Sequence, residues 1–230
     1  MKCIAIIPAR SGSKGIRDKN IKLLAGKPML AYSIGAAKQS GIFSEIMVST
    51  DSEQYAEISR NWGANVPFLR SRETSSDSAS SWDMVKEVLE NYRKAGQEYD
   101  AFCLLQPTSP LRTAEDIRKA YELLKKAETA VVSVCETDHS PLWCNRLPDD
   151  GSLNGLIRRN DNRRRQETGK FYRINGAIYF VRTDAFDQDT FLYREGSFAY
   201  VMEKDRSVDI DTQLDFEFAE FLMEKMNGQG

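Results

Sequence analysis

Several segments of the chain carry charged and polar residues in patterns suited to binding a phosphorylated ligand. The first, P-A-R-S-G-S-K-G-I-R-D-K-N at residues 8–20, includes the cations Arg10, Lys14 and Lys19. Its small residues and glycines let the backbone come close to a ligand, so that N–H groups can cradle phosphate oxygens. The P-loop pattern is absent because Lys14 is followed by Gly15, and no G-x-G-x-x-G occurs. The segment predicts a triphosphate site, although a basic solvated turn would have the same composition.

Two further segments place hydroxyl and amide groups where a ligand could meet them. Residues 106–112, Q-P-T-S-P-L-R, contain two prolines that stiffen the loop and begin with Gln106. Residues 70–81 are rich in serine and precede a predicted helix, whose N-terminus favours anions. Each segment could also be an ordinary turn ahead of a helix cap.

A pair of carboxylates occurs in V-D-I-D-T, residues 208–212. In an extended segment alternate side chains point the same way, so Asp209 and Asp211 would share one face. Mg²⁺ is usually bound by one or two carboxylates together with substrate phosphates. The pair therefore predicts a Mg²⁺ site, and the simpler alternative is that Asp211 or Thr212 caps the last helix.

A strongly basic stretch covers residues 158–165 and is followed by F-Y-R-I-N-G-A at 171–177. Such a run could bind RNA or form a solvated edge. The formal net charge of −2 and the lack of an aromatic stacking pattern disfavour nucleic acid. A forked guanidinium suits a carboxylate, so an acidic ligand is the better expectation.

The elements that must position these segments alternate along the chain. Continuous apolar runs predict strands at residues 3–7, 46–49, 101–105, 130–134 and 177–181, with a possible short edge strand at 66–69. Helical periodicity lies between them, and Ser80 with Asp83 forms a predicted capping box. The last helix has its predicted apolar face at Leu214, Phe218, Phe221 and Leu222.

This alternation predicts an α/β fold, a mostly parallel sheet with helices on both faces. Ligands of such sheets bind at the carboxyl ends of the strands, which is where the polar segments fall. The stretch from about 136 to 172 is too long for a simple connection and predicts an inserted lobe in an otherwise single domain.

Composition limits the remaining possibilities. The chain has 230 residues, 41% of them apolar, and we expect no secretory signal and no membrane span. The four cysteines fit neither a zinc site nor a disulfide framework, and the expected location is cytoplasmic. His139 is the only histidine, which excludes a two-histidine metal site.

The motifs together resemble those of the CMP-sialic acid synthetases, also called acylneuraminate cytidylyltransferases. The family pattern A-R-x-x-S-K-G-x-x-x-K-N is matched at Arg10, Ser13, Lys14, Gly15, Lys19 and Asn20. L-Q-P-T-S-P-L-R, R-x-N-G-A-I-Y and D-I-D-T follow in the family's order. The resemblance implies a Rossmann-like nucleotidyltransferase core, an inserted dimerisation lobe and a homodimer. It also implies the reaction of CTP with an acidic nine-carbon sugar to give a CMP-sugar and pyrophosphate, with Mg²⁺ as cofactor.

The resemblance also implies roles for individual residues. The catalytic residues would be Lys19, Arg10 and Asp211, with Asp209 and Asp211 holding the metal. The nucleotide would be bound by Arg10, Ser13, Lys14, Lys19, Asn20, Arg70 and Ser81. The sugar would be bound by Gln106, Arg165, Arg173, Asn175 and Tyr179.

The sequence leaves the acceptor sugar open. Where family members often have a lysine after the His-x-Pro-Leu segment, this chain has Trp143. Legionaminic acid or another nonulosonic acid is the nearer alternative to N-acylneuraminate, and retention of L-Q-P-T-S-P-L-R argues against the octulosonic enzymes. A non-catalytic nucleotide- or RNA-binding protein is the more distant alternative.

Overall fold

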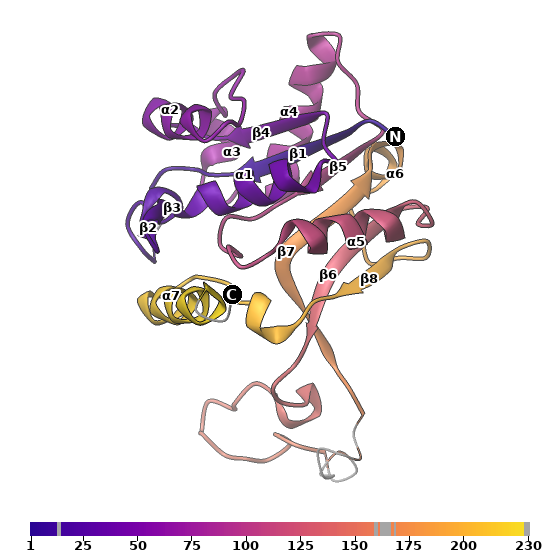
Figure 1. Ribbon diagram of the computed structural model, residues 1–230. Helices are drawn as coiled ribbons and strands as arrows, with labels where there is room; N and C mark the ends of the chain where they lie inside the picture. Colours follow the sequence, from indigo (N-terminus) through magenta and orange to yellow (C-terminus); the bar gives the residue numbers. More distant parts are fainter. Residues whose placement is uncertain (13–14, 159–160, 162–166, 168, 228–230) are drawn as a thin grey trace.

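The core of the protein is one six-stranded sheet with the strand order β4-β1-β5-β7-β6-β8 (Figure 1). The computed structural model describes residues 1–12, 15–158, 161, 167 and 169–227. The strands of the sheet are β1 (Cys3–Pro8), β4 (Glu45–Ser49), β5 (Ala101–Leu104), β6 (Ala130–Glu136), β7 (Tyr172–Arg182) and β8 (Phe198–Val201). A separate short hairpin is formed by β2 (Leu23–Leu24) and β3 (Lys27–Pro28).

The strand directions confirm the predicted α/β class with a mostly parallel sheet. β1 pairs in parallel with β4 and β5, and β6 pairs in parallel with β8. β7 lies between β5 and β6 and runs antiparallel to both. The possible strand at 66–69 does not form, and only Asn65 makes an isolated bridge to Met47. β8 was not predicted.

Helices cover both faces of the sheet. On one face, α1 (Met29–Ser40), α2 (Glu53–Asn61) and α5 (Ala114–Leu124) pack on one apolar cluster. On the other, α4 (Ser81–Lys94) and α6 (Thr183–Gln188) pack on a second. The predicted capping box of Ser80 and Asp83 starts α4, and Thr113 with Asp116 forms another at α5. The remaining short elements are α3 (Arg72–Ser75), η1 (Lys19–Ile21), η2 (Pro141–Trp143) and η5 (Lys204–Arg206).

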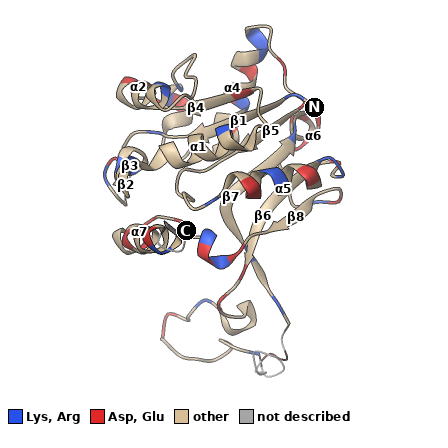
Figure 2. Cartoon of the chain, in the orientation of Figure 1, with Lys and Arg blue, Asp and Glu red and all other residues tan. Residues whose placement is uncertain are grey.

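The last helix, α7 (Gln213–Asn227), corrects one prediction. Its buried residues Phe216, Ala219 and Met223 join a third apolar cluster. The predicted inner residues Leu214, Phe218 and Phe221 are instead 74%, 50% and 56% exposed. The helix is apolar on more than one side, so periodicity alone selected the wrong face. Figure 2 marks acidic residues in red along this helix.

β6 and β7 continue past the layered core and lead into the segment between them, which extends away from the sheet (Figure 1). This segment contains η2, and its role in pairing subunits stays a prediction. Among the described residues, no helix combines the length and the apolar composition needed to cross a membrane.

Candidate active site

The first predicted segment folds from the end of β1 against residues 208–212. The Lys19 ammonium donates hydrogen bonds to the Ile210 carbonyl at 2.7 Å and to the Asp211 carboxylate at 3.0 Å. A Cβ on Gly15 would lie 2.6 Å from the Asp211 carbonyl oxygen, so only glycine permits this approach. The buried Asn20 amide donates to the Arg10 carbonyl at 3.0 Å and holds the segment's shape. The site thus joins both ends of the chain.

Two arginines approach each other beside this segment. The Arg10 guanidinium bonds the Asp77 carboxylate at 2.8 Å and the Ser75 carbonyl at 3.2 Å. Burial lowers the pKa of Arg70, the charges of Asp51 and Glu87 oppose this shift, and the charge of Arg10 adds to it. The Arg70 Nε is buried and has no hydrogen-bond partner among the described residues. The two guanidinium groups can attract a bound anion, while Asp77 beside Arg10 and Asp51 and Glu87 beside Arg70 already supply negative charge.

The loop after β5 is fixed in place by a buried arginine, Arg112. The Arg112 guanidinium is 3% exposed and donates to the carbonyls of Gln106, Ser109 and Ala177 at 3.2–3.3 Å. Burial lowers the pKa of Arg112 to about 10. Two carbonyls of the loop and one of β7 therefore hold Arg112, and the half-buried side chains of Gln106 and Thr108 line the cavity.

The Gln106 side chain lies directly over Gly176 of β7. A Cβ at Gly176, where φ is +75°, would meet Gln106 Oε1 at 2.6 Å and Asp209 Oδ2 at 3.8 Å. The Gln106 amide and the Asp209 carboxylate thus converge on a space that any larger residue would fill. Nearby, the Ile210 N–H donates to the Thr108 carbonyl at 2.8 Å and joins the two segments.

The Asp209 carboxylate responds to burial and to the groups around it. Partial desolvation raises the pKa of Asp209, and the negative charge of Asp211 adds to this effect, whereas a hydrogen bond from Thr108 opposes it. Within the described part of the chain, no cluster of three or more His, Cys, Asp or Glu side chains could hold a metal ion alone. Two neighbouring carboxylates fit Mg²⁺ only if substrate phosphates and water complete its oxygen ligands.

These segments enclose a cavity of about 370 Å³ at the carboxyl ends of β1 and β5. It collects the described residues predicted to bind the nucleotide, together with Gln106 and Asp211. Its lining is Pro8, Arg10, Gly15, Lys19, Asn20, Arg70, Ser76, Asp77, Ala79, Ser81, Gln106, Pro107, Thr108 and Asp211. A larger cavity of about 670 Å³, lined by Met1, Tyr99 and Arg182 among others, contains none of the predicted residues. Ser13, Lys14 and Arg165 lie outside the described residues.

The predicted sugar-binding residues of β7 differ in position. Arg173 is exposed, donates to the Ser207 carbonyl at 3.1 Å, and lies near enough to Asp209 for its charge to oppose the rise in the pKa of that carboxyl. Asn175 is 1% exposed, and its amide is bonded to the hydroxyls of Ser133 and Ser207 at 2.6 and 2.9 Å. Because both ends of this amide are satisfied inside the protein, direct sugar binding by Asn175 is not supported. Asn175 instead fixes β7 beside the site.

Tyr179 is also part of the interior rather than of the cavity lining. Its ring packs edge-on against Trp82, with centroids 5.7 Å apart, and burial raises its pKa to about 12. The prediction that Tyr179 binds sugar is therefore not supported. Since Trp82 follows Ser81 in the first turn of α4, Tyr179 helps to place Ser81 in the cavity.

The sequence analysis did not identify the residues that fix the loops of the cavity in place. The Arg10–Asp77 ion pair and the buried Arg112 are the main examples. Asp77 was visible only as one polar residue among serines. Arg112 had a weak signal, because a charged residue closes an otherwise uncharged motif.

The fold and cavity define an α/β protein with a cavity lined by Arg10, Lys19 and Arg70 at the carboxyl ends of β1 and β5. Comparison with protein-family models is specific: residues 4–228 match the cytidylyltransferase model, and the chain belongs to this family.

Two curated relatives are similar along nearly the whole chain. An N-acylneuraminate cytidylyltransferase of Escherichia coli O18:K1:H7 is 40% identical over 230 residues, which cover 99% of this chain and 54% of the relative. The chain thus spans about half the length of that relative. A CMP-N,N'-diacetyllegionaminic acid synthase of Legionella pneumophila is 37% identical over 225 residues, 97% of each chain.

A solved structure shares the fold. The CMP:2-keto-3-deoxy-manno-octonic acid synthetase complexed with CTP superimposes with a TM-score of 0.74 at 19% identity. The match covers 98% of this chain and 100% of that structure.

Proposed function

We propose that the protein transfers CMP from CTP to an acidic nine-carbon sugar of the N-acylneuraminate type and releases pyrophosphate. The observation that carries the proposal is the cavity in which Arg10, Lys19, Arg70, Gln106 and Asp211 meet. Cations for a triphosphate, an amide for a polar acceptor and a carboxylate for a proton are present together. The similarity to an N-acylneuraminate cytidylyltransferase supports the same reaction.

The reaction that we infer is an in-line displacement at the α-phosphorus of CTP. The anomeric hydroxyl oxygen of the sugar bonds to the α-phosphorus, and the bond to the bridging oxygen of the β-phosphate breaks. Pyrophosphate leaves with the electron pair, and Asp211 accepts the hydroxyl proton. Because negative charge moves toward the leaving group, catalysis depends on positioned cations. Lys19 is suited to stabilise pyrophosphate, with Arg10 and Lys14 on the other phosphate oxygens.

The remaining nucleotide and sugar contacts are part of the same proposal. We assign Ser13, Asn20, Arg70 and Ser81 to the nucleotide. Gln106 would bind sugar hydroxyls, and the guanidinium groups of Arg165 and Arg173 would bind the sugar carboxylate as paired donors.

We further infer that Mg²⁺ is required and that Asp209 and Asp211 hold it with the phosphates. Bound there, the ion would neutralise phosphate charge and acidify the attacking hydroxyl. The Lys19 ammonium donates to the Asp211 carboxylate at 3.0 Å, so this carboxylate is oriented before substrate arrives.

A homodimer and a cytoplasmic location complete the proposal. The lobe exposes Leu147, Leu153 and Ile157 at 58%, 72% and 39%, which supports its use in subunit contacts. Cys3, Cys103 and Cys135 are buried free thiols, as expected in a reducing compartment that also supplies CTP.

The experiment that tests the proposal is pyrophosphate release from CTP and Mg²⁺ with four acids offered separately. These are N-acetylneuraminic, legionaminic, pseudaminic and 3-deoxy-octulosonic acids. We expect release with N-acetylneuraminic acid, and a strong preference for legionaminic acid would transfer the proposal to the reaction of the Legionella relative. A folded protein that binds CTP and releases pyrophosphate with none of them would contradict it.

A further inference from the structure

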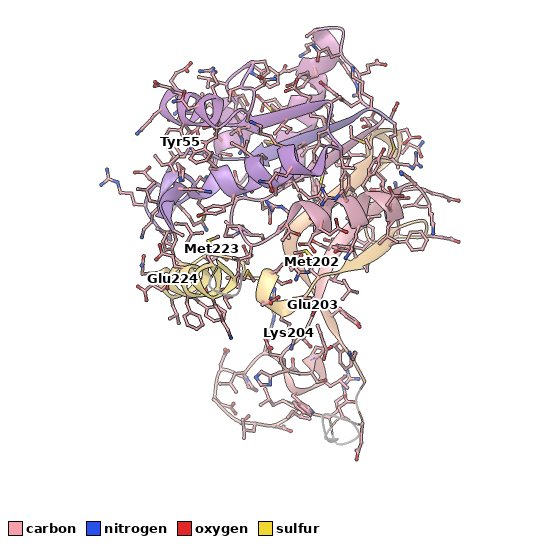
Figure 3. The ribbon with its side chains drawn as sticks, viewed as in Figure 1. Tyr55, Met202, Glu203, Lys204, Met223 and Glu224 are labelled. Carbon is pink, nitrogen blue, oxygen red and sulfur yellow. The ribbon has the colours of Figure 1, made fainter. Side chains whose placement is uncertain are left out.

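The segment that carries Asp209 and Asp211 is anchored at the turn just before it. β8 leads into η5, whose last residue is Arg206, and the 208–212 segment follows. Figure 2 shows this charged turn between α7 and β8, and Figure 3 labels Met202, Glu203 and Lys204 there. Whatever fixes η5 therefore also fixes where the two carboxylates begin.

η5 is fixed by an ion pair with α5. Arg206 donates from Nε to Asp116 Oδ2 at 3.2 Å and from Nη2 to Asp116 Oδ1 at 3.1 Å. Asp116 is 2% exposed and accepts three more hydrogen bonds, from the Thr113 N–H and hydroxyl and from the Tyr200 hydroxyl. Five donors fix the orientation of the Asp116 carboxylate. Because Arg206 binds both carboxylate oxygens, the position of its guanidinium is fixed as well.

The ion pair of Arg206 and Asp116 links two parts of the candidate site. Thr113 and Asp116 form the capping box of α5, directly after the 106–112 loop. On the η5 side, the buried Ser207 receives the Asn175 amide on its hydroxyl, and its carbonyl receives Arg173. The pair therefore connects the loop carrying Gln106 with the turn that holds Arg173 and leads to Asp209.

We propose that Arg206, clamped by Asp116, is a positioning residue that sets the two aspartates for metal-dependent nucleotide binding. It touches no predicted substrate group and acts through the backbone of η5. The inference rests on the proposed function for the identity of the metal and the nucleotide. A purely structural role would affect stability and leave the Mg²⁺ dependence of the folded protein unchanged.

The test compares Arg206→Lys with Arg118→Lys. Lysine keeps the charge and loses the fork in both. Arg118 is a matched control because it lies on the same helix as Asp116 and pairs with Glu115 at 2.9 Å on the surface. Thermal unfolding midpoints are measured for the full chain without ligand, with CTP alone, and with CTP and Mg²⁺. The Mg²⁺ concentration for half-maximal pyrophosphate release is then measured.

We expect Arg206→Lys to keep the midpoint shift from CTP alone and to lose most of the further shift from Mg²⁺. Its half-maximal Mg²⁺ concentration should rise about tenfold or more, the range known for residues that orient metal ligands. Arg118→Lys should match the wild type in both measurements. If Arg206→Lys fails to fold, Tyr200→Phe, which removes one donor to Asp116, should show a smaller effect in the same direction.

A folded Arg206→Lys variant with wild-type Mg²⁺ dependence would overturn the inference. If Arg206→Lys does not fold, wild-type Mg²⁺ dependence in Tyr200→Phe would overturn it. A wild type without any Mg²⁺-dependent midpoint shift would overturn it too. If the wild type shows that shift but releases no pyrophosphate with any acid, the proposed function fails. The midpoint comparison then still decides the role of Arg206.

Discussion

Gly176 offers a sharp test of the proposed sugar contact of Gln106. It has a φ of +75°, and a Cβ there would lie 2.6 Å from Gln106 Oε1 and 3.5 Å from Ser109 Oγ. Gly176→Ala should therefore push the end of the Gln106 side chain away from its present position. Gln106 is the proposed amide contact to the sugar, so the substitution should weaken sugar binding without touching the nucleotide side.

Gly176→Ala should change two measured quantities, the Tm and the sugar KM. The left-handed conformation costs an L-residue about 1–2 kcal/mol, and a domain of this size loses about 2–4 °C in Tm per kcal/mol. Gly176→Ala should thus lower the Tm by about 2–8 °C. Loss of one hydrogen bond to the sugar, about 0.5–1.5 kcal/mol, should raise the sugar KM about 2- to 10-fold.

Gly41→Ala separates these effects. Gly41 ends α1 with a φ of +68° and has no atom within 4 Å of a Cβ. It should lose similar stability and keep the wild-type sugar KM, whereas Gly176→Ala should change both. Pyrophosphate release at varied sugar and at varied CTP gives the two KM values. An unchanged sugar KM in Gly176→Ala, or the same rise in both variants, would refute the reasoning.

Three further substitutions test other parts of the site. Lys19→Ala should reduce kcat about 10²- to 10³-fold, since it removes a cation from the leaving group, and near-normal kcat would exclude that role. Arg173→Ala should raise the sugar KM far more than the CTP KM in the same assay, and equal effects would remove it from the sugar site. Asp116→Asn should lower the free energy of unfolding at pH 7, by less than the about 3–5 kcal/mol typical of a fully buried pair, because Arg206 is 27% exposed. Burial alone would raise the pKa of Asp116, but hydrogen bonds from Arg206 and Thr113 outweigh it and lower the pKa below 3.8. The ionised carboxylate therefore adds stability above pH 3.8 that is lost as pH falls through the lower folded pKa, so in urea titrations the two proteins should converge under acid conditions.

The parts of the fold that were predictable are those with a local physical signal. β1 and β5 are continuous apolar runs because both faces of these strands are covered. The capping box at Ser80 and Asp83 was visible because its two residues are three apart. Placing the polar loops at the strand ends then brought Lys19 and Asp211 together, although they are 192 positions apart in sequence.

The parts of the fold and site that could not be predicted depend on contacts between residues that are distant in sequence. α7 carries apolar residues on several sides, and only the packed structure selects Phe216 over Phe218. Asn175 looks like a ligand contact in a motif, yet it lies in the interior where Ser133 and Ser207 satisfy it. No pattern along the chain indicates such pairings between distant residues.

The place of β7 in the sheet has a consequence for how the chain folds on the ribosome. β7 alone joins β5 to β6, so the sheet cannot close until residues 172–182 have been made. The exposed edge of β5 must wait while roughly 70 intervening residues are added, which takes about 4–14 s at 5–20 residues per second. An unpaired apolar edge is a template for wrong pairing during that interval. The period in which residues 105–171 are made is therefore the part of synthesis in which the edge of β5 is most open to wrong pairing.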